Sequence, residues 1–261
     1  MRRKVIKALK KIYIILLKIM NWNNTFGMKK LLVASTSTTY GGKYLEYIMN
    51  ELDNFFDSKE PIIFIPYARP GGITHDKYTE IVKSSFKTIG KEVIGLHKTD
   101  NPKKTLTNAK GIFVGGGNTF VLMNKMYELN LLEKLKSAIL SGVPYLGTSA
   151  GSNLCGLTIG TSNDMPIVYP PSFAALGVLP FNINPHYRDS NPESKHMGET
   201  RNTRIKEFHF FNDQPVIGLR EGSYLKVIGD KITLKGKYNA TIFEKEKPPY
   251  ELLAGENLKF Q

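Results

Sequence analysis

Short apolar runs alternate with amphipathic segments along the chain from Lys30 onward. The apolar runs predict buried strands at 31–34, 62–65, 93–96 and 111–114, with a further strand opening at Pro144. Between them, apolar residues recur at three- and four-residue spacing, which predicts helices over 44–56, 75–89, 120–127 and 131–140. Strands that alternate with helices are typical of βα units. The pattern therefore predicts an α/β fold with a mostly parallel sheet flanked by helices.

The pattern changes in the last third of the chain. Apolar runs at 178–183, 216–219, 224–227, 232–234 and 240–243 predict further strands. The short connections among the last four predict a small antiparallel C-terminal appendix at the sheet edge. Nothing in this appendix suggests catalysis. With no long linker or repeat, we expect a single α/β catalytic domain over 28–261, preceded by an extension over 1–27.

Composition limits the classes of protein that fit this chain. It has 261 residues, 41% of them hydrophobic, which is enough for a substantial core. The single cysteine, Cys155, excludes an internal disulfide framework and a multi-cysteine zinc site. It fits a reducing compartment, and we expect a cytoplasmic protein in which Cys155 is a small buried residue.

The net charge of +13 is concentrated in the extension. Residues 1–27 hold seven Lys and Arg and no acid, which leaves 29 basic and 23 acidic residues in the rest, an ordinary surface. A nucleic-acid partner is therefore not expected. The apolar run at 12–17 is far too short for a membrane span, and no small-residue cleavage site follows it. A weak membrane-surface contact, organelle targeting or an extension without structural role remain, and we favour the last.

A candidate nucleophile lies at Ser149, in the sequence Gly-Thr-Ser-Ala-Gly at 147–151. A G-x-S-x-G pattern after an apolar run is typical of a strand-to-helix elbow that exposes a serine Oγ above a parallel sheet. An ordinary glycine- and serine-rich loop is the alternative, because short motifs recur by chance.

A second glycine turn, at 115–117, follows a predicted strand and precedes a helix. Its N–H groups are suited to hold an anion. Phosphate binding is weakly supported, because the lysine of a phosphate-binding loop is absent. The turn can instead supply an oxyanion hole to a nucleophile on the next strand, or be a plain tight turn.

A serine nucleophile needs a histidine base and a group that orients the histidine. Of the five histidines, His186 follows an apolar run and an Asn-Pro pair, at the exit of a predicted strand. The others lie in loops or helices, at His75, His97, His196 and His209. Asp164 is the candidate for the orienting acid, with Asp189 and Glu199 as rivals and a turn-forming role as the alternative.

These residues resemble the peptidase E family of α-aspartyl dipeptidases. Five ordered blocks carry the resemblance: Gly-Gly-Gly-Asn-Thr-Phe at 115–120, Gly-Thr-Ser-Ala-Gly-Ser-Asn at 147–153, Asn-Asp-Met-Pro at 163–166, Ile-Asn-Pro-His at 183–186 and Gly-Glu-Thr-Arg at 198–201. The resemblance extends from about Lys29 to the C-terminus and implies a class I glutamine amidotransferase-like fold. It places the catalytic serine, aspartate and histidine at Ser149, Asp164 and His186. The extension 1–27 departs from the family pattern.

The resemblance also implies a substrate, a dipeptide with an N-terminal aspartate, and no metal or organic cofactor. A guanidinium binds a carboxylate bidentately, so Arg201 and Arg204 are candidates for the aspartate side chain and Glu199 for the free amine. Surface pairing within a helix start is the alternative for these three. Asn118 is a further candidate contact to the substrate. The expected oxyanion donors are backbone N–H groups, those of Gly116, Gly117 and Ala150.

Two other functions compete with this one. A cyanophycinase-like β-aspartyl peptidase would use the same type of elbow on a polymer. A basic module that binds nucleic acid or membrane through 1–27 would not need Ser149. Either a monomer or a homodimer is compatible with the sequence.

Overall fold

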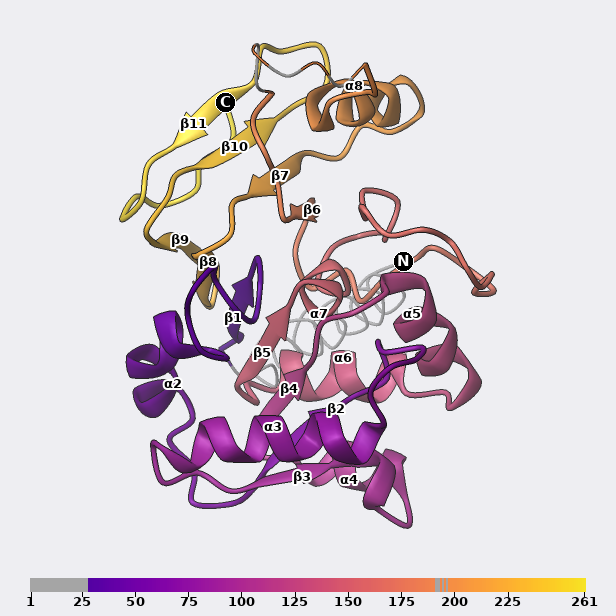
Figure 1. Cartoon of the computed structure of the whole chain (residues 1–261), viewed down its shortest axis with the longest axis vertical. Helices are drawn as coiled ribbons and strands as arrows, with labels where there is room; N and C mark the ends of the chain where they lie inside the picture. The colour runs from indigo at the N-terminus through magenta and orange to yellow at the C-terminus, as the bar shows by residue number, and fades with distance from the viewer. Residues whose placement is uncertain (1–27, 191–192, 194, 196) are drawn as a thin grey trace, which may run out of the picture.

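A seven-stranded sheet forms the centre of the computed structural model, which describes residues 28–190, 193, 195 and 197–261 (Figure 1). The expected extension 1–27 and His196 lie outside the described residues. The strand order is β3-β2-β4-β5-β1-β8-β9. These strands are β1 (Lys30–Ala34), β2 (Ile62–Ile65), β3 (Val93–Gly95), β4 (Ile112–Val114), β5 (Tyr145–Thr148), β8 (Ser223–Ile228) and β9 (Lys231–Gly236). The first five run parallel, and β8 and β9 extend the sheet antiparallel.

Helices cover both faces of this sheet, because alternate strand residues point to opposite sides. On one face Leu32, Phe64 and Phe113 pack with buried residues of α2 (Met49–Phe55) and α3 (His75–Lys87). On the other, Val33, Ile65 and Val114 pack against the remaining helices that precede the second sheet in the chain. These are α4 (Pro102–Asn108), α5 (Thr119–Glu128), α6 (Leu132–Leu140) and the short α7 (Ala150–Asn153).

A second sheet has four strands in the order β11-β10-β7-β6, and Figure 1 shows it with α8 (Arg201–Phe211) at one end of the molecule. Its strands are β6 (Asn182–Pro185), β7 (Val216–Leu219), β10 (Ala240–Phe243) and β11 (Tyr250–Leu252). The expectation of one antiparallel appendix is wrong in part. Strands β8 and β9 do extend the edge of the first sheet, but β7 and β10 leave it, and β7 pairs in parallel with β6.

Several element boundaries differ from the predicted ones. The helix expected over 44–56 is a 3-10 turn, η1 (Glu46–Ile48), followed by α2. Strand β6 begins four residues later than predicted, since Pro180 has no N–H to donate to a ladder. Residues after β3 form a second 3-10 turn, η2 (Leu96–Lys98), and α4 was not predicted.

The register places three strand ends together. Ala34 at the end of β1 is paired with Thr148 of β5, and Val114 at the end of β4 with Gly147. The predicted adjacency of the strands before the two glycine turns is therefore confirmed. The turns after β4 and β5 lie at the same edge of the sheet, which is where α/β sheets bind ligands.

Candidate active site

Ser149 lies at a sharp turn between β5 and α7, with φ 53° and ψ −109°. This left-handed backbone is uncommon for a residue with a side chain and is typical of functional sites. The flanking glycines make room for it. A Cβ at Gly147 would lie 2.6 Å from the Gly151 carbonyl oxygen, and a Cβ at Gly151 would collide with the Val114 carbonyl oxygen. The G-x-S-x-G pattern therefore reflects close packing of α7 against β4 and β5.

The structure brings Ser149 and His186 together across the two sheets. His186 follows directly after β6, and its Nε2 lies 2.9 Å from Ser149 Oγ. Its φ of 54° also falls in the left-handed region. A histidine at this distance can accept the serine proton.

The other imidazole nitrogen is hydrogen-bonded to Glu221, a residue that sequence reasoning missed. His186 Nδ1 lies 2.6 Å from Glu221 Oε1. A carboxylate accepts a hydrogen bond from Nδ1–H, which leaves the Nε2 lone pair facing Ser149. Glu221 lies between β7 and β8, in the segment where no catalytic group was expected. Only its adjacency to His186 in the fold reveals it.

Asp164 does not show the expected pairing with His186 in the structure, where Glu221 is the carboxylate beside the imidazole. The Oδ2 of Asp164 accepts hydrogen bonds from the backbone N–H of Thr119, at 2.8 Å, and from the hydroxyl of Ser162, at 3.0 Å. Thr119 is the first residue of α5, and a carboxylate is stabilised at a helix N-terminus by the helix dipole. Asp164 therefore joins its loop to the helix that follows the triglycine turn. The rival acids pair with arginines and not with His186: Asp189 with Arg220 and Glu199 with Arg204.

Backbone N–H groups are available beside Ser149. A Cβ at Gly116 would lie 3.1 Å from the Ser149 Cβ, so the triglycine turn contacts the nucleophile directly. Among the described residues, no acceptor bonds to the N–H of Gly116 or Gly117. Ala150 is the first residue of α7, where N–H groups have no intrahelical acceptor. These donors suit an oxyanion that develops at Ser149.

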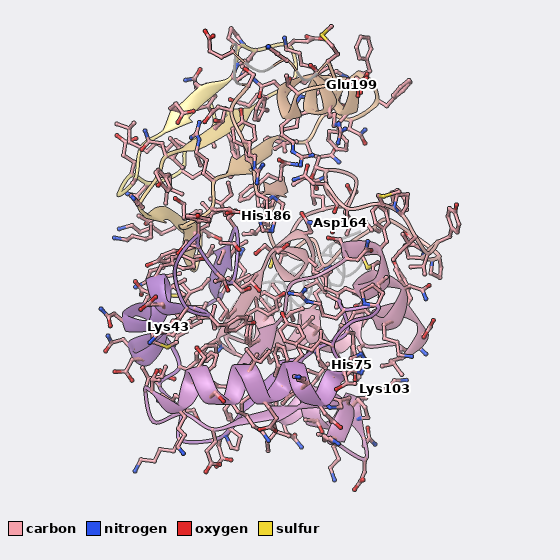
Figure 2. The ribbon with its side chains drawn as sticks, in the orientation of Figure 1. Lys43, His75, Lys103, Asp164, His186 and Glu199 are labelled. Carbon is pink, nitrogen blue, oxygen red and sulfur yellow. The ribbon has the colours of Figure 1, made fainter. Side chains whose placement is uncertain are left out.

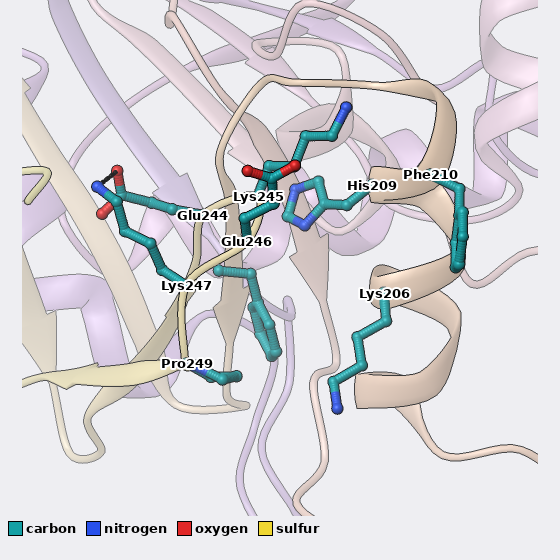
Figure 3. Close-up of a pocket in the computed structure, with 9 residues that line it drawn as sticks. Lys206, His209, Phe210, Glu244, Lys245, Glu246, Lys247 and Pro249 are labelled. Carbon is teal, nitrogen blue, oxygen red and sulfur yellow. Dashed lines mark hydrogen bonds and ion pairs between the residues drawn. The ribbon is translucent and has the colours of Figure 1, made fainter.

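The other described histidines lie away from Ser149. His97 Nε2 is 2.8 Å from Asp76, and its ring contacts that of His75. His209 Nε2 is 3.1 Å from the Gln214 carbonyl oxygen. His209 lines a pocket of 490 Å³ between α8 and the loop after β10, which includes neither Ser149 nor His186 (Figure 3).

The residues expected to contact the substrate differ in their surroundings. Asn118 caps α5, since its Oδ1 accepts from the N–H groups of Phe120 and Val121. Glu199 lies 3.8 Å from Arg204, both half exposed, and Figure 2 shows Glu199 well separated from His186. Arg201 is more buried, and this burial lowers the pKa of its guanidinium, as do the nearby Arg204 and Arg188, while Asp164 acts in the opposite direction.

Other chemistry finds little support in the described part of the chain. No group of three or more His, Cys, Asp or Glu side chains there is arranged to hold a metal ion. Cys155 is fully buried, as expected, and burial raises the pKa of its thiol to about 12. No helix within 28–261, where described, has the length and apolar content to cross a membrane.

Comparison with known proteins identifies a family and several relatives. The model of peptidase family S51 matches residues 31–235. Peptidase E of Streptomyces coelicolor is 44% identical, over 87% of this chain and 93% of its own. A probable alpha-aspartyl dipeptidase of Drosophila melanogaster is 43% identical, over 89% and 97%.

Solved structures confirm the fold. A crystal structure of a peptidase from an acI-B1 Actinobacterium superimposes with a TM-score of 0.68 at 20% identity, covering 90% of this chain and 98% of its own. A putative peptidase E protein from Listeria monocytogenes gives 0.61 at 20% identity, covering 81% and 100%. The expected class I glutamine amidotransferase-like architecture is confirmed. The chain belongs to peptidase family S51 and is a serine peptidase.

Proposed function

We propose that this protein hydrolyses dipeptides with an N-terminal aspartate, through an acyl-enzyme on Ser149. The observation that carries the proposal is the continuous contact from Ser149 Oγ through the imidazole of His186 to Glu221, at 2.9 and 2.6 Å. The family model and the relative named an alpha-aspartyl dipeptidase support the reaction and the substrate.

The contacts suggest one sequence of proton transfers. His186 Nε2 takes the hydroxyl proton as Ser149 Oγ attacks the peptide carbonyl carbon. The same proton passes to the leaving amine when the C–N bond breaks, which leaves an ester on Ser149. Water then attacks this ester, giving its proton to Nε2, and Ser149 recovers a proton as aspartate leaves. Glu221 holds the imidazole in the tautomer that each step needs.

The negative oxygen of each tetrahedral intermediate needs donors that are already in place. We assign the N–H groups of Ala150 and of Gly116 or Gly117 to this role. Loss of one such donor costs about 2.7–4 kcal/mol of transition-state stabilisation in comparable enzymes. Because these donors belong to the backbone, the strained turn at Ser149 and the triglycine turn supply them without a side chain.

Arg201 is the better candidate for the aspartate side chain of the substrate. Its guanidinium is partly buried, and the positive charges of Arg204 and Arg188 lower its pKa, a surrounding that favours an incoming anion. Arg204 is the second candidate, but its guanidinium lies beside Glu199.

Asp164 is better placed than Glu199 to receive the free amine of the substrate. Its Oδ2 is held at the N-terminus of α5, and no described residue hydrogen-bonds to its Oδ1. A fixed carboxylate with one unused oxygen suits an ammonium group. This role replaces the orienting role that the sequence suggested.

The competing functions receive less support. The names of the most similar relatives do not favour the cyanophycinase-like alternative. The binding-module alternative depends on residues 1–27, which the family model does not include.

Hydrolysis of an Asp-Xaa dipeptide series by wild type, Ser149→Ala and Arg201→Met tests the proposal. Wild type should release aspartate, and Ser149→Ala should be folded but inactive. Arg201→Met should lose activity on Asp-Xaa far more than on the matched Asn-Xaa series, whose amide lacks the charge. Turnover by Ser149→Ala, or cleavage of a β-aspartyl-arginine polymer alone, would refute it.

A further inference from the structure

Ser35 lies directly after β1 and is completely buried. Its hydroxyl donates a 2.7 Å hydrogen bond to the carbonyl oxygen of Leu219, the last residue of β7. The Oγ of Ser35 in turn accepts a 2.9 Å hydrogen bond from the backbone N–H of His186. One side chain from the first sheet therefore contacts the ends of both β6 and β7 in the second.

The preceding residue, Ala34, holds the nucleophile in a similar way. Its carbonyl oxygen accepts a 3.1 Å hydrogen bond from the N–H of Ser149 and a 2.7 Å bond from the hydroxyl of Ser152. Two consecutive residues, the last of β1 and the one that follows it, thus contact the two sides of the site. Ala34 fixes the turn that carries the nucleophile, and Ser35 fixes the backbone that carries the base.

The backbone of His186 needs such support. With φ 54° it adopts a conformation that persists in a non-glycine residue only where the surroundings impose it. Its N–H lies beyond the last register pair of β6 and β7, and Ser35 supplies its acceptor. Without that hydroxyl, a partly buried donor would lose its partner.

The contact at Leu219 also lies close in the chain to Glu221, the carboxylate of the site. Glu221 follows Leu219 by two residues, and its carboxylate bonds to His186 Nδ1. The Leu219 carbonyl oxygen also accepts a 3.2 Å bond from the N–H of Tyr187. The Ser35 hydroxyl and the Tyr187 N–H therefore both donate to the Leu219 carbonyl oxygen, which ties the segment that carries His186 to the segment that carries Glu221.

We propose that Ser35 is a positioning residue, which aligns His186 Nε2 with Ser149 Oγ across the junction of the two sheets. It acts through the backbone and, being buried, does not contact substrate. The inference rests on the proposed function for its kinetic readout, but its spectroscopic readout needs no substrate.

The test compares Ser35→Ala with Ser223→Ala. Ser223 is equally buried, and its hydroxyl also donates to a carbonyl oxygen and accepts from an N–H, both of Tyr238. The two variants lose the same kinds of hydrogen bond and should have similarly lowered Tm. Only Ser35→Ala should lower kcat on an Asp-Xaa dipeptide, by roughly tenfold or more, as a misplaced catalytic group does. KM should stay within about twofold of wild type in both, since neither side chain is placed at the substrate.

Proton NMR supplies the second readout. The low-field resonance of the His186 Nδ1–H bond to Glu221 should be present in wild type and Ser223→Ala, and weakened or lost in Ser35→Ala. If Ser35→Ala does not fold, Ser35→Cys replaces it, because a thiol keeps the shape but bonds weakly.

Two results would overturn the proposal. One is a folded Ser35 variant with the kcat and the resonance of wild type. The other is an equal loss of kcat in both alanine variants, which would mean a general effect of buried hydroxyl loss. A wild type that shows the resonance but no hydrolysis of Asp-Xaa would contradict the proposed function alone, and the resonance would still decide the role of Ser35.

Discussion

At the scale of single residues, the carboxylate beside His186 differs from the one that the sequence suggested: it is Glu221 and not Asp164. Asp164 has the residue type and the sequence position of an orienting acid, but a helix N-terminus takes its Oδ2. Glu221 belongs to no recognised motif, yet it lies 2.6 Å from His186 Nδ1. A hydrogen bond between side chains 35 residues apart has no local sequence signal.

The two acids should therefore give different kinetic effects. We expect Glu221→Gln to lower kcat by about 10²- to 10⁴-fold, because the amide no longer stabilises the charged imidazole or selects its tautomer. Asp164→Asn should mainly raise KM for Asp-Xaa dipeptides, since the proposed contact is to the substrate amine. Steady-state kinetics of both variants checks this. The reverse pattern, with kcat lost only in Asp164→Asn, would return the orienting role to Asp164.

At the scale of elements, the hydrophobic pattern was a good guide to the first sheet. Its parallel strands are buried on both faces and appear as continuous apolar runs, as at Ile62–Ile65. The edges of elements were less predictable. The helix expected from residue 44 begins as a 3-10 turn after Leu45, which has φ 58°. A conformation imposed by the surrounding fold has no periodic signature.

The elbow glycines give a prediction at this scale. Gly151→Ala should lower the free energy of unfolding by about 3 kcal/mol, because the new Cβ meets the Val114 carbonyl oxygen and α7 must move away from β4. Chemical denaturation checks the value, and activity should fall with it as Ser149 moves. Gly71→Ala is the control, since no atom lies within 4 Å of its added Cβ. Equal stability of the two variants would show that α7 tolerates the extra atom.

At the scale of the whole molecule, the site depends on the junction of the two sheets. Ser149 follows a strand of the first sheet, His186 follows a strand of the second, and Glu221 lies where the chain passes from β7 to β8. Arg220, beside Glu221, joins the segment after β6 to β11. Its guanidinium forms two hydrogen bonds with each of two carboxylates, those of Asp189 and Glu251.

This junction should respond to acid. The hydrogen bonds from Arg220 hold the pKa of Asp189 below its usual value. A depressed pKa stabilises the fold above the unfolded-state value of about 3.9, and the benefit is lost as pH falls through the folded-state pKa. Arg220→Met should therefore have a lower Tm than wild type at neutral pH, and the difference should shrink below about pH 4.

Thermal unfolding of both proteins across this range is the measurement. Lys83→Met is a suitable control, because its exposed pair with Glu80 on one helix should contribute little at any pH. A Tm difference for Arg220→Met that does not change with acid would mean that the stabilisation comes from packing of its side chain and not from its charge.

By itself, the sequence determined the α/β class and the neighbouring glycine turns, and it predicted the candidate nucleophile Ser149 and the candidate base His186. These features depend on local pattern, since hydrophobic period, turn residues and strand exits act over a few residues. Only the tertiary structure decided that Glu221 pairs with that base, that Asp164 bonds to the N-terminus of α5, and that Ser35 lies between the two sheets. Such contacts join segments far apart in the chain, because the packing of one sheet against another selects them and no short stretch of sequence contains them.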